Sequence, residues 1–145
     1  MILGTTTLAY AHCQVPCGIY NEEARFTAMR EDATTIEKAT KLIAELSGKT
    51  DAASKQQLVR WTITKEDHAS SIISTVAEYF LTQKIKPADG KDKKAYAKYV
   101  EQLKACHLVM RAAMGTKQKV DPKAVDSLKL AIEKLAAFYT HTHEK

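Results

Sequence analysis

The chain has 145 residues, which is enough for one domain with its own hydrophobic core. Hydrophobic residues make up 45% of it and charged residues 27%, as in ordinary globular proteins, and no apolar run is as long as a membrane span. The net charge of +5 comes from basic residues that are spread out, without Arg interleaved with aromatics. We therefore expect neither a nucleic-acid nor a membrane partner. Three cysteines are too few for a disulfide scaffold.

Residues 1–11 (MILGTTTLAYA) carry no charge and end in the small-residue sequence Ala9-Tyr10-Ala11. They lack the basic start and the uninterrupted apolar stretch of a secretory signal. We expect a short pro-segment that a processing peptidase removes by cutting after Ala11, and a cytoplasmic protein. The alternative is an N-terminal segment that is simply retained.

Residues 12–20 (HCQVPCGIY) concentrate the potential metal ligands of the chain. Pro16 fixes its backbone φ and Gly18 permits positive φ, so this segment can curl and bring the two thiolates to one ion. A cut after Ala11 would free the α-amine of His12. That amine, the His12–Cys13 backbone nitrogen and the Cys13 sulfur would then form fused chelate rings, which favour a square plane. This geometry with nitrogen donors is characteristic of Cu(II) or Ni(II).

The pattern His-Cys-x-x-Pro-Cys-Gly-x-Tyr in residues 12–20 closely resembles the nickel-binding hook of the nickel superoxide dismutase family. The resemblance implies a proprotein that is cut just before the histidine, and a hook that binds one nickel ion per subunit. It also implies a four-helix bundle that assembles into a homohexamer. The expected reaction is the disproportionation of superoxide to oxygen and hydrogen peroxide, with nickel alternating between Ni(II) and Ni(III).

The resemblance also implies roles for individual residues. His12 would supply its amine and an axial imidazole, Cys13 its amide nitrogen and thiolate, and Cys17 the second thiolate. Tyr20 would stand beside the open axial side and help to position superoxide. The segment Glu78-Tyr79-Phe80 resembles the family segment that brings a second tyrosine, here Tyr79, near the metal.

Two helices are predicted after the hook. The first begins at the N-cap Asn21 and ends at Gly48, with apolar residues in steps of three and four at Phe26, Met29, Ala33, Ile36, Thr40 and Ile43. The second begins after Asp51 and ends before Pro87, with its apolar face at Leu58, Trp61, Ile72, Val76, Tyr79 and Phe80. Its middle, residues 64–67, is polar, so we expect a bend or an exposed section there, and an exposed His68.

Two more helices follow the same spacing. The third has its face at Tyr96, Tyr99, Leu103, Cys106, Met110 and Ala113, with Gly115 at its end and Cys106 as a buried apolar residue. The fourth begins with Asp121-Pro122, an N-cap followed by proline, and continues at Val125, Leu128, Ile132, Leu135 and Tyr139. The predicted fold class is all-α: an antiparallel up-and-down four-helix bundle at residues 21–145, preceded by the hook at residues 12–20.

Two other functions stay open from the residues alone. The bundle could carry Ni, Cu or Zn through the hook without catalysis. Alternatively, Cys13 and Cys17 could act as a redox dithiol that needs no metal. Adjacent residues on a helix point about 100° apart, so Cys106 and His107 are a poor metal pair.

Overall fold

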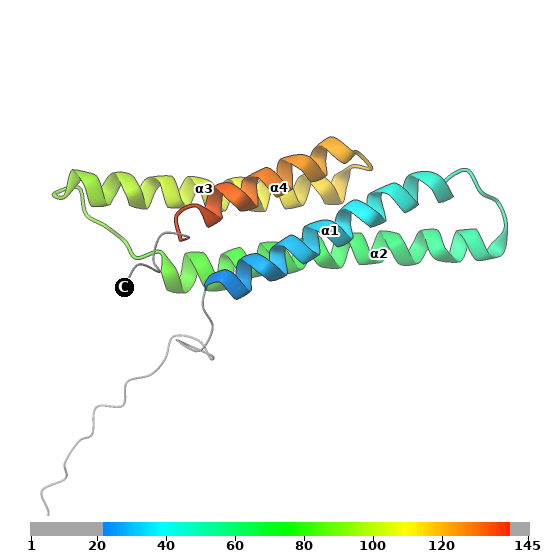
Figure 1. Ribbon diagram of the computed structural model, residues 1–145, viewed down its shortest axis with the longest axis horizontal. Coiled ribbons are helices and arrows are strands. Elements are labelled where there is room, and N and C mark those ends of the chain that lie inside the picture. The colour runs from blue at the N-terminus through cyan, green and yellow to red at the C-terminus, as the bar shows by residue number, and fades with distance from the viewer. Residues whose placement is uncertain (1–21, 140–145) are drawn as a thin grey trace, which may run out of the picture.

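The computed structural model describes residues 22–139 of the chain. It contains α1 (Glu22–Leu46), α2 (Ala52–Thr75), α3 (Lys93–Gln118) and α4 (Pro122–Ala136), and α2 continues directly into a π-helix, η1 (Val76–Lys84). Successive helices run in opposite directions (Figure 1). Within residues 22–139 the predicted all-α, antiparallel up-and-down four-helix bundle is therefore confirmed.

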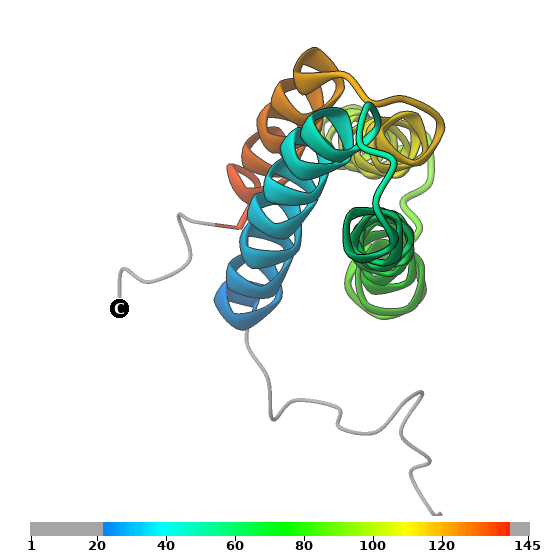
Figure 2. The same ribbon diagram turned by 90° about the vertical axis from the view of Figure 1, so that its right-hand side faces the viewer.

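Each helix packs against two neighbours, in the order α1–α2–α3–α4 and back from α4 to α1. Figure 2, a view along the bundle, shows α2 and α3 nearly end-on and α1 and α4 tilted across them. The start of α1, the end of η1 and the start of α3 lie toward the same end of the bundle. That end is the one from which the N-terminal segment leaves.

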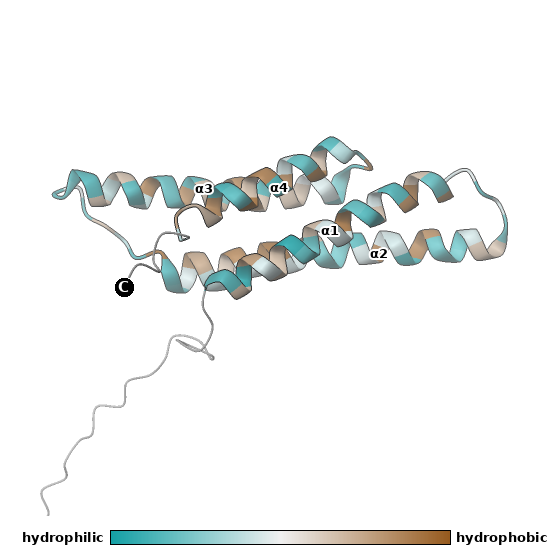
Figure 3. Ribbon diagram, viewed as in Figure 1, coloured by the Kyte–Doolittle hydropathy of each residue, from teal (hydrophilic) through white to brown (hydrophobic). Residues whose placement is uncertain are grey.

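The apolar stripes meet in a single core. Its largest fully buried side chains are Phe26, Phe80, Met29, Ile36, Ile72, Leu128, Ile132 and Leu135. Hydrophobic residues, brown in Figure 3, accordingly recur along the inner faces of the helices. Burial of side chains of this size stabilises a fold by about 1.5–3 kcal/mol each. Cys106 is fully buried, as expected, but Tyr96 is 46% exposed, because residues 93–98 at the start of α3 lie in solvent. No helix within residues 22–139 is both long and apolar enough to span a membrane.

The predicted helix starts are confirmed by capping contacts. The Asp51 carboxylate accepts a hydrogen bond of 2.9 Å from the amide of Ser54, and the Asp121 carboxylate accepts one of 2.9 Å from Lys123. Asp92 caps α3 in the same way, accepting from the amides of Lys94 and Ala95 at 3.0 Å. Each of these caps satisfies amides that have no partner within the helix.

The predicted end of the third helix at Gly115 is wrong, because α3 continues to Gln118. A side chain from α2 satisfies the carbonyls at its end. The ammonium of Lys65 donates to the carbonyl oxygens of Thr116, Lys117 and Lys119, at 2.5, 3.1 and 3.2 Å. A cation at the negative end of a helix dipole is also electrostatically favourable. The end of α3 is therefore stabilised by a lysine from another helix and not by a glycine within α3.

The bend predicted for the polar middle of the second helix is also wrong, although Asp67 is exposed as expected. Residues 64–67 lie within regular α-helix, and Lys65 is only 3% exposed. His68 is half-exposed and paired, with its Nδ1 2.6 Å from the Asp32 carboxylate of α1. The irregular section comes later, in η1, where the Thr82 hydroxyl donates to the carbonyl of Ala77 at 2.7 Å. The backbone shows the π-helical pattern where the Ile85 amide donates to the Phe80 carbonyl, five residues earlier, at 2.9 Å.

Replacing Lys65 with methionine tests the interaction between α2 and the end of α3. Lys65→Met keeps an unbranched side chain of similar length but leaves three carbonyls without their donor. We expect the free energy of unfolding to fall by about 1–3 kcal/mol, measured by urea unfolding followed by circular dichroism. The matched control is Lys55→Met on the exposed face of α2, which should stay within about 0.5 kcal/mol of the wild type. Equal losses in both variants would contradict this role for Lys65.

A second prediction concerns the ion pair that joins α1 to α4. Arg30 donates from Nε and Nη2 to the two carboxylate oxygens of Glu133, at 2.8 and 3.0 Å. Hydrogen bonds from Arg30, with its charge, lower the pKa of Glu133 below its ordinary value of 4.5, against a smaller opposing effect of burial. A lowered carboxyl pKa stabilises the fold at higher pH, and this contribution is lost as the pH falls through the folded-state pKa.

Glu133→Gln should therefore be less stable than the wild type at pH 7, by about 0.2–1 kcal/mol for a pair this exposed. The difference should shrink as the pH falls below about 4.5 and vanish in stronger acid. Unfolding midpoints of both proteins between pH 7 and pH 3 measure it. A difference that stays constant over this range would show that packing, and not the charge of Glu133, is responsible.

Candidate metal centre

The hook residues His12, Cys13, Cys17 and Tyr20 lie outside the described residues, which begin at Glu22. The structure does describe the surface next to the point where the hook joins the bundle. That surface is formed by the first turn of α1, by η1 and by the turn after α4. Tyr79, the remaining predicted site residue, belongs to it.

Tyr79 lies in η1 and is 7% exposed. Its neighbour Phe80 is fully buried, and the two rings meet edge to face with centroids 5.2 Å apart. The wider π-helical turn accompanies this joint burial, and π-helical turns frequently occur at functional sites.

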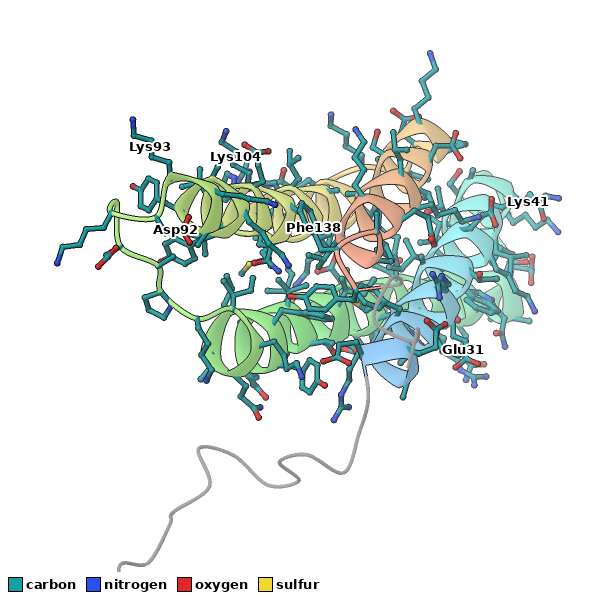
Figure 4. The ribbon with its side chains drawn as sticks, turned by 60° about the vertical axis from the view of Figure 1, so that its left-hand side comes forward. Glu31, Lys41, Asp92, Lys93, Lys104 and Phe138 are labelled. Carbon is teal, nitrogen blue, oxygen red and sulfur yellow. The ribbon has the colours of Figure 1, made fainter. Side chains whose placement is uncertain are left out.

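The rings of three elements pack together beneath Tyr79. Phe80 contacts Phe26 of α1 and Tyr139 after α4, with centroid distances of 5.0 and 5.3 Å, and Phe26 lies 5.8 Å from Tyr139. We call Phe26, Tyr79, Phe80 and Tyr139 the aromatic cluster. Offset and edge-to-face pairs at these distances add to the burial of the rings. The cluster holds η1 against the start of α1. Phe138, from the same turn as Tyr139, packs against the core beside it (Figure 4).

The Tyr139 phenol of this cluster stays protonated. Burial raises the pKa of Tyr139 far above its ordinary range, and the nearby Cys106, Glu22 and Tyr79 raise it further. The side-chain amide of Gln102 donates to the Tyr139 hydroxyl at 3.4 Å, with a smaller opposite effect. Tyr139 therefore acts as a neutral packing group beneath Tyr79.

Two basic side chains, which the sequence did not single out, flank the Tyr79 ring. The Arg25 guanidinium carbon lies 5.0 Å from the ring centroid, and the Lys84 ammonium lies 5.8 Å from it. Lys84 also forms an ion pair with Glu22, the first residue of α1. Arg25 comes one position before the buried Phe26, but nothing in the sequence connects it with η1. Only the packing of α1 on η1 brings these side chains together.

Within residues 22–139 no group of three or more His, Cys, Asp or Glu side chains is arranged to hold a metal ion. Cys106 is the one free cysteine in this range, and burial raises the pKa of its thiol to about 11. It therefore stays a protonated thiol, which is a poor metal ligand. His107 is exposed, and His68 is paired with Asp32. The described part of the bundle is thus a scaffold without a metal site of its own.

Comparison with known proteins identifies the metal and the reaction. The family model described as nickel-containing superoxide dismutase matches residues 7–143, a range that includes both the hook motif and all four helices. No curated protein and no solved structure gives a significant match. The family's cofactor is nickel and its substrate is superoxide. Since the match covers nearly the whole chain, the protein belongs to the nickel-containing superoxide dismutase family.

Proposed function

We propose that His12, Cys13 and Cys17 hold the nickel ion at the end of the bundle where α1 begins, and that superoxide is disproportionated there. The donor set supports this assignment, because the His12 amine, the amide nitrogen of Cys13 and two thiolates would offer nitrogen and sulfur donors to the nickel of this family. The lack of a metal-binding cluster within residues 22–139 supports it as well. When bound, nickel supplies the one-electron chemistry that oxidises one superoxide and reduces another.

The covalent connection limits where this site can be. Cys17 precedes Glu22 by five positions, so its Cα lies within about 18 Å of that of Glu22 even in a fully extended chain. The 25 residues of α1 extend over about 37 Å. Cys17, and any metal ion that it shares with the other proposed ligands, is therefore tethered near the start of α1. Tyr79 and Tyr20 are then available to line the approach to the metal and to limit the entry of water.

Charge at this end of the bundle favours an anionic substrate. Residues 86–98 contain five lysines and two aspartates, a net charge of +3 out of +5 for the whole chain. Figure 4 shows Lys93 at the start of α3, pointing away from the bundle. Positive surfaces raise the encounter rate of small anions, most strongly at low ionic strength.

We further propose that residues 1–11 are a pro-segment. While they are attached, His12 has no free α-amine and the donor set lacks one nitrogen. Residues 12–20 then form the metal hook and residues 21–145 the bundle domain. A processing peptidase and a cytoplasmic location belong to the same proposal, supported by the uncharged sequence that ends in Ala9-Tyr10-Ala11.

Assembly into a homohexamer completes the proposal. Thiolates oxidise readily in superoxide and peroxide, and a nine-residue hook on a single bundle would be poorly covered. Contact between subunits would shield it. The described surface has large apolar side chains available for such contacts, among them Val59, Ile63, Leu108 and Leu130, each more than half exposed.

A pair of proteins that differ by one residue at the N-terminus tests the role of the His12 amine. One begins at His12 and the other at Ala11, so that a peptide bond blocks the amine while the imidazole and both thiols remain. The form that begins at His12 should bind one nickel ion per chain and disproportionate superoxide. The form that begins at Ala11 should be weaker in activity by more than about a hundredfold, since even groups outside the ligand shell contribute 10–100-fold.

Metal analysis and a pulse-radiolysis assay of superoxide decay on the same samples give the result. A variant with His141→Ala in the form that begins at His12 controls for binding by the C-terminal histidines and should match the parent. Equal activity of the two forms would contradict amine ligation. Nickel binding without dismutation would indicate the non-enzymatic carrier.

A further inference from the structure

The Tyr79 ring lies between cations from two different elements. Arg25 comes from α1 and Lys84 from the last position of η1, at 5.0 and 5.8 Å from the ring centroid. Both distances are within the range of about 6 Å for a cation–π interaction. With the ring only 7% exposed, the cations are in contact with a side chain that has little freedom to reorient.

Lys84 makes a second interaction that connects Tyr79 with the root of the hook. Its ammonium pairs with the carboxylate of Glu22, whose side chain is 23% exposed. Glu22 is the first residue of α1 and follows the hook after a single intervening residue, Asn21. A displacement of either the start of α1 or the end of η1 would break this pair. The ion pair therefore fixes the hook's point of attachment relative to Tyr79.

We propose that Arg25 and Lys84, together with Glu22, are positioning residues of the nickel site: they set the orientation of Tyr79 and the place where the hook leaves the bundle. We call Arg25, Lys84 and Glu22 the clamp. This inference rests on the proposed function, because the clamp would act on a metal held by residues 12–20. Arg25, Lys84 and Glu22 do not ligate the metal. They act through Tyr79 and through the backbone at the start of α1.

Stability alone does not explain the arrangement. Ion pairs at a partly exposed surface contribute only a small fraction of the stability of a domain. The Lys129–Glu37 pair, at 2.7 Å, joins α4 to α1 with a similarly exposed lysine and a more exposed glutamate. It is a matched control, because it links two helices away from the start of α1.

The experiment compares Lys84→Met, Glu22→Gln and their double variant with Lys129→Met, Glu37→Gln and theirs, all in the nickel-loaded form that begins at His12. Lys84→Arg keeps the charge and serves as a rescue variant. The measurements are the rate of nickel release to a chelator, the second-order rate constant for superoxide and the unfolding midpoint. In metal-free protein, amide hydrogen exchange of residues 76–84 is measured as well.

We expect Lys84→Met and Glu22→Gln each to release nickel about tenfold faster or more, as for other groups outside a ligand shell. The double variant should be no worse than either single variant, because one interaction is lost in all three. Amide hydrogen exchange of residues 76–84 should be faster in the same variants. Lys84→Arg should retain most of the wild-type behaviour, and the Lys129 and Glu37 variants should change none of these readouts beyond a small shift in midpoint.

Nickel release that is the same in the Lys84 and Lys129 variants would overturn the clamp, as would faster release that only follows a lower unfolding midpoint. Failure of the proposed function is a separate result. In that case the wild-type form that begins at His12 would itself hold no nickel. Hydrogen exchange in the metal-free protein would still show whether Lys84 and Glu22 fix η1, and unchanged exchange in their variants would overturn the clamp there too.

Discussion

The packing of Phe26 and Tyr139 on Phe80 is the interaction on which the candidate site depends. These rings come from α1, from the turn after α4 and from η1, and they fill the core at the end where the N-terminal segment joins the bundle. Aromatic side chains contribute large buried areas with few rotatable bonds, so the cluster is both stabilising and rigid. Tyr79 packs edge to face on Phe80, and the two cations lie over the Tyr79 ring. Ordered packing therefore extends from the core to Glu22, which follows the hook after one intervening residue.

The proposed location of the metal ligands differs from that in bundles that bind metals in their core. Such bundles place Glu and His side chains on facing helices, directed into the core. In residues 22–139 the core is almost wholly apolar, and the exceptions, such as Thr40, Lys65 and Thr116, bond to backbone carbonyls. The proposed ligands are instead contributed by a short segment before the first helix. In the proposed site the bundle would supply rigidity, charge and Tyr79, and residues 12–20 would supply the ligands.

Much of the bundle follows from local signals in the sequence. Asp51 and Asp121-Pro122 predict helix starts correctly because capping involves residues only a few positions apart. The spacing of apolar residues alone predicts the buried faces, because an apolar stripe on a helix is buried against another helix. The failures at Gly115 and at residues 64–67 have a common cause: Lys65 bonds to backbone more than fifty positions away. The position of Arg25 beside Tyr79 likewise results from helix packing, which spacing does not show. The hook motif identifies the proposed ligands, while their geometry lies outside the described residues.

The burial of Cys106 has a consequence for a protein whose product is hydrogen peroxide. Peroxide attacks thiolates, and a thiol with a pKa of about 11 is almost entirely protonated at neutral pH. With no exposed surface, Cys106 is also out of reach of a polar oxidant. Cys106 is thus chemically inert and only fills space, in contrast to the reactive thiolates proposed for the hook. Oxidative damage in the described bundle would then begin at other side chains, such as the exposed Met114, before it reaches the core.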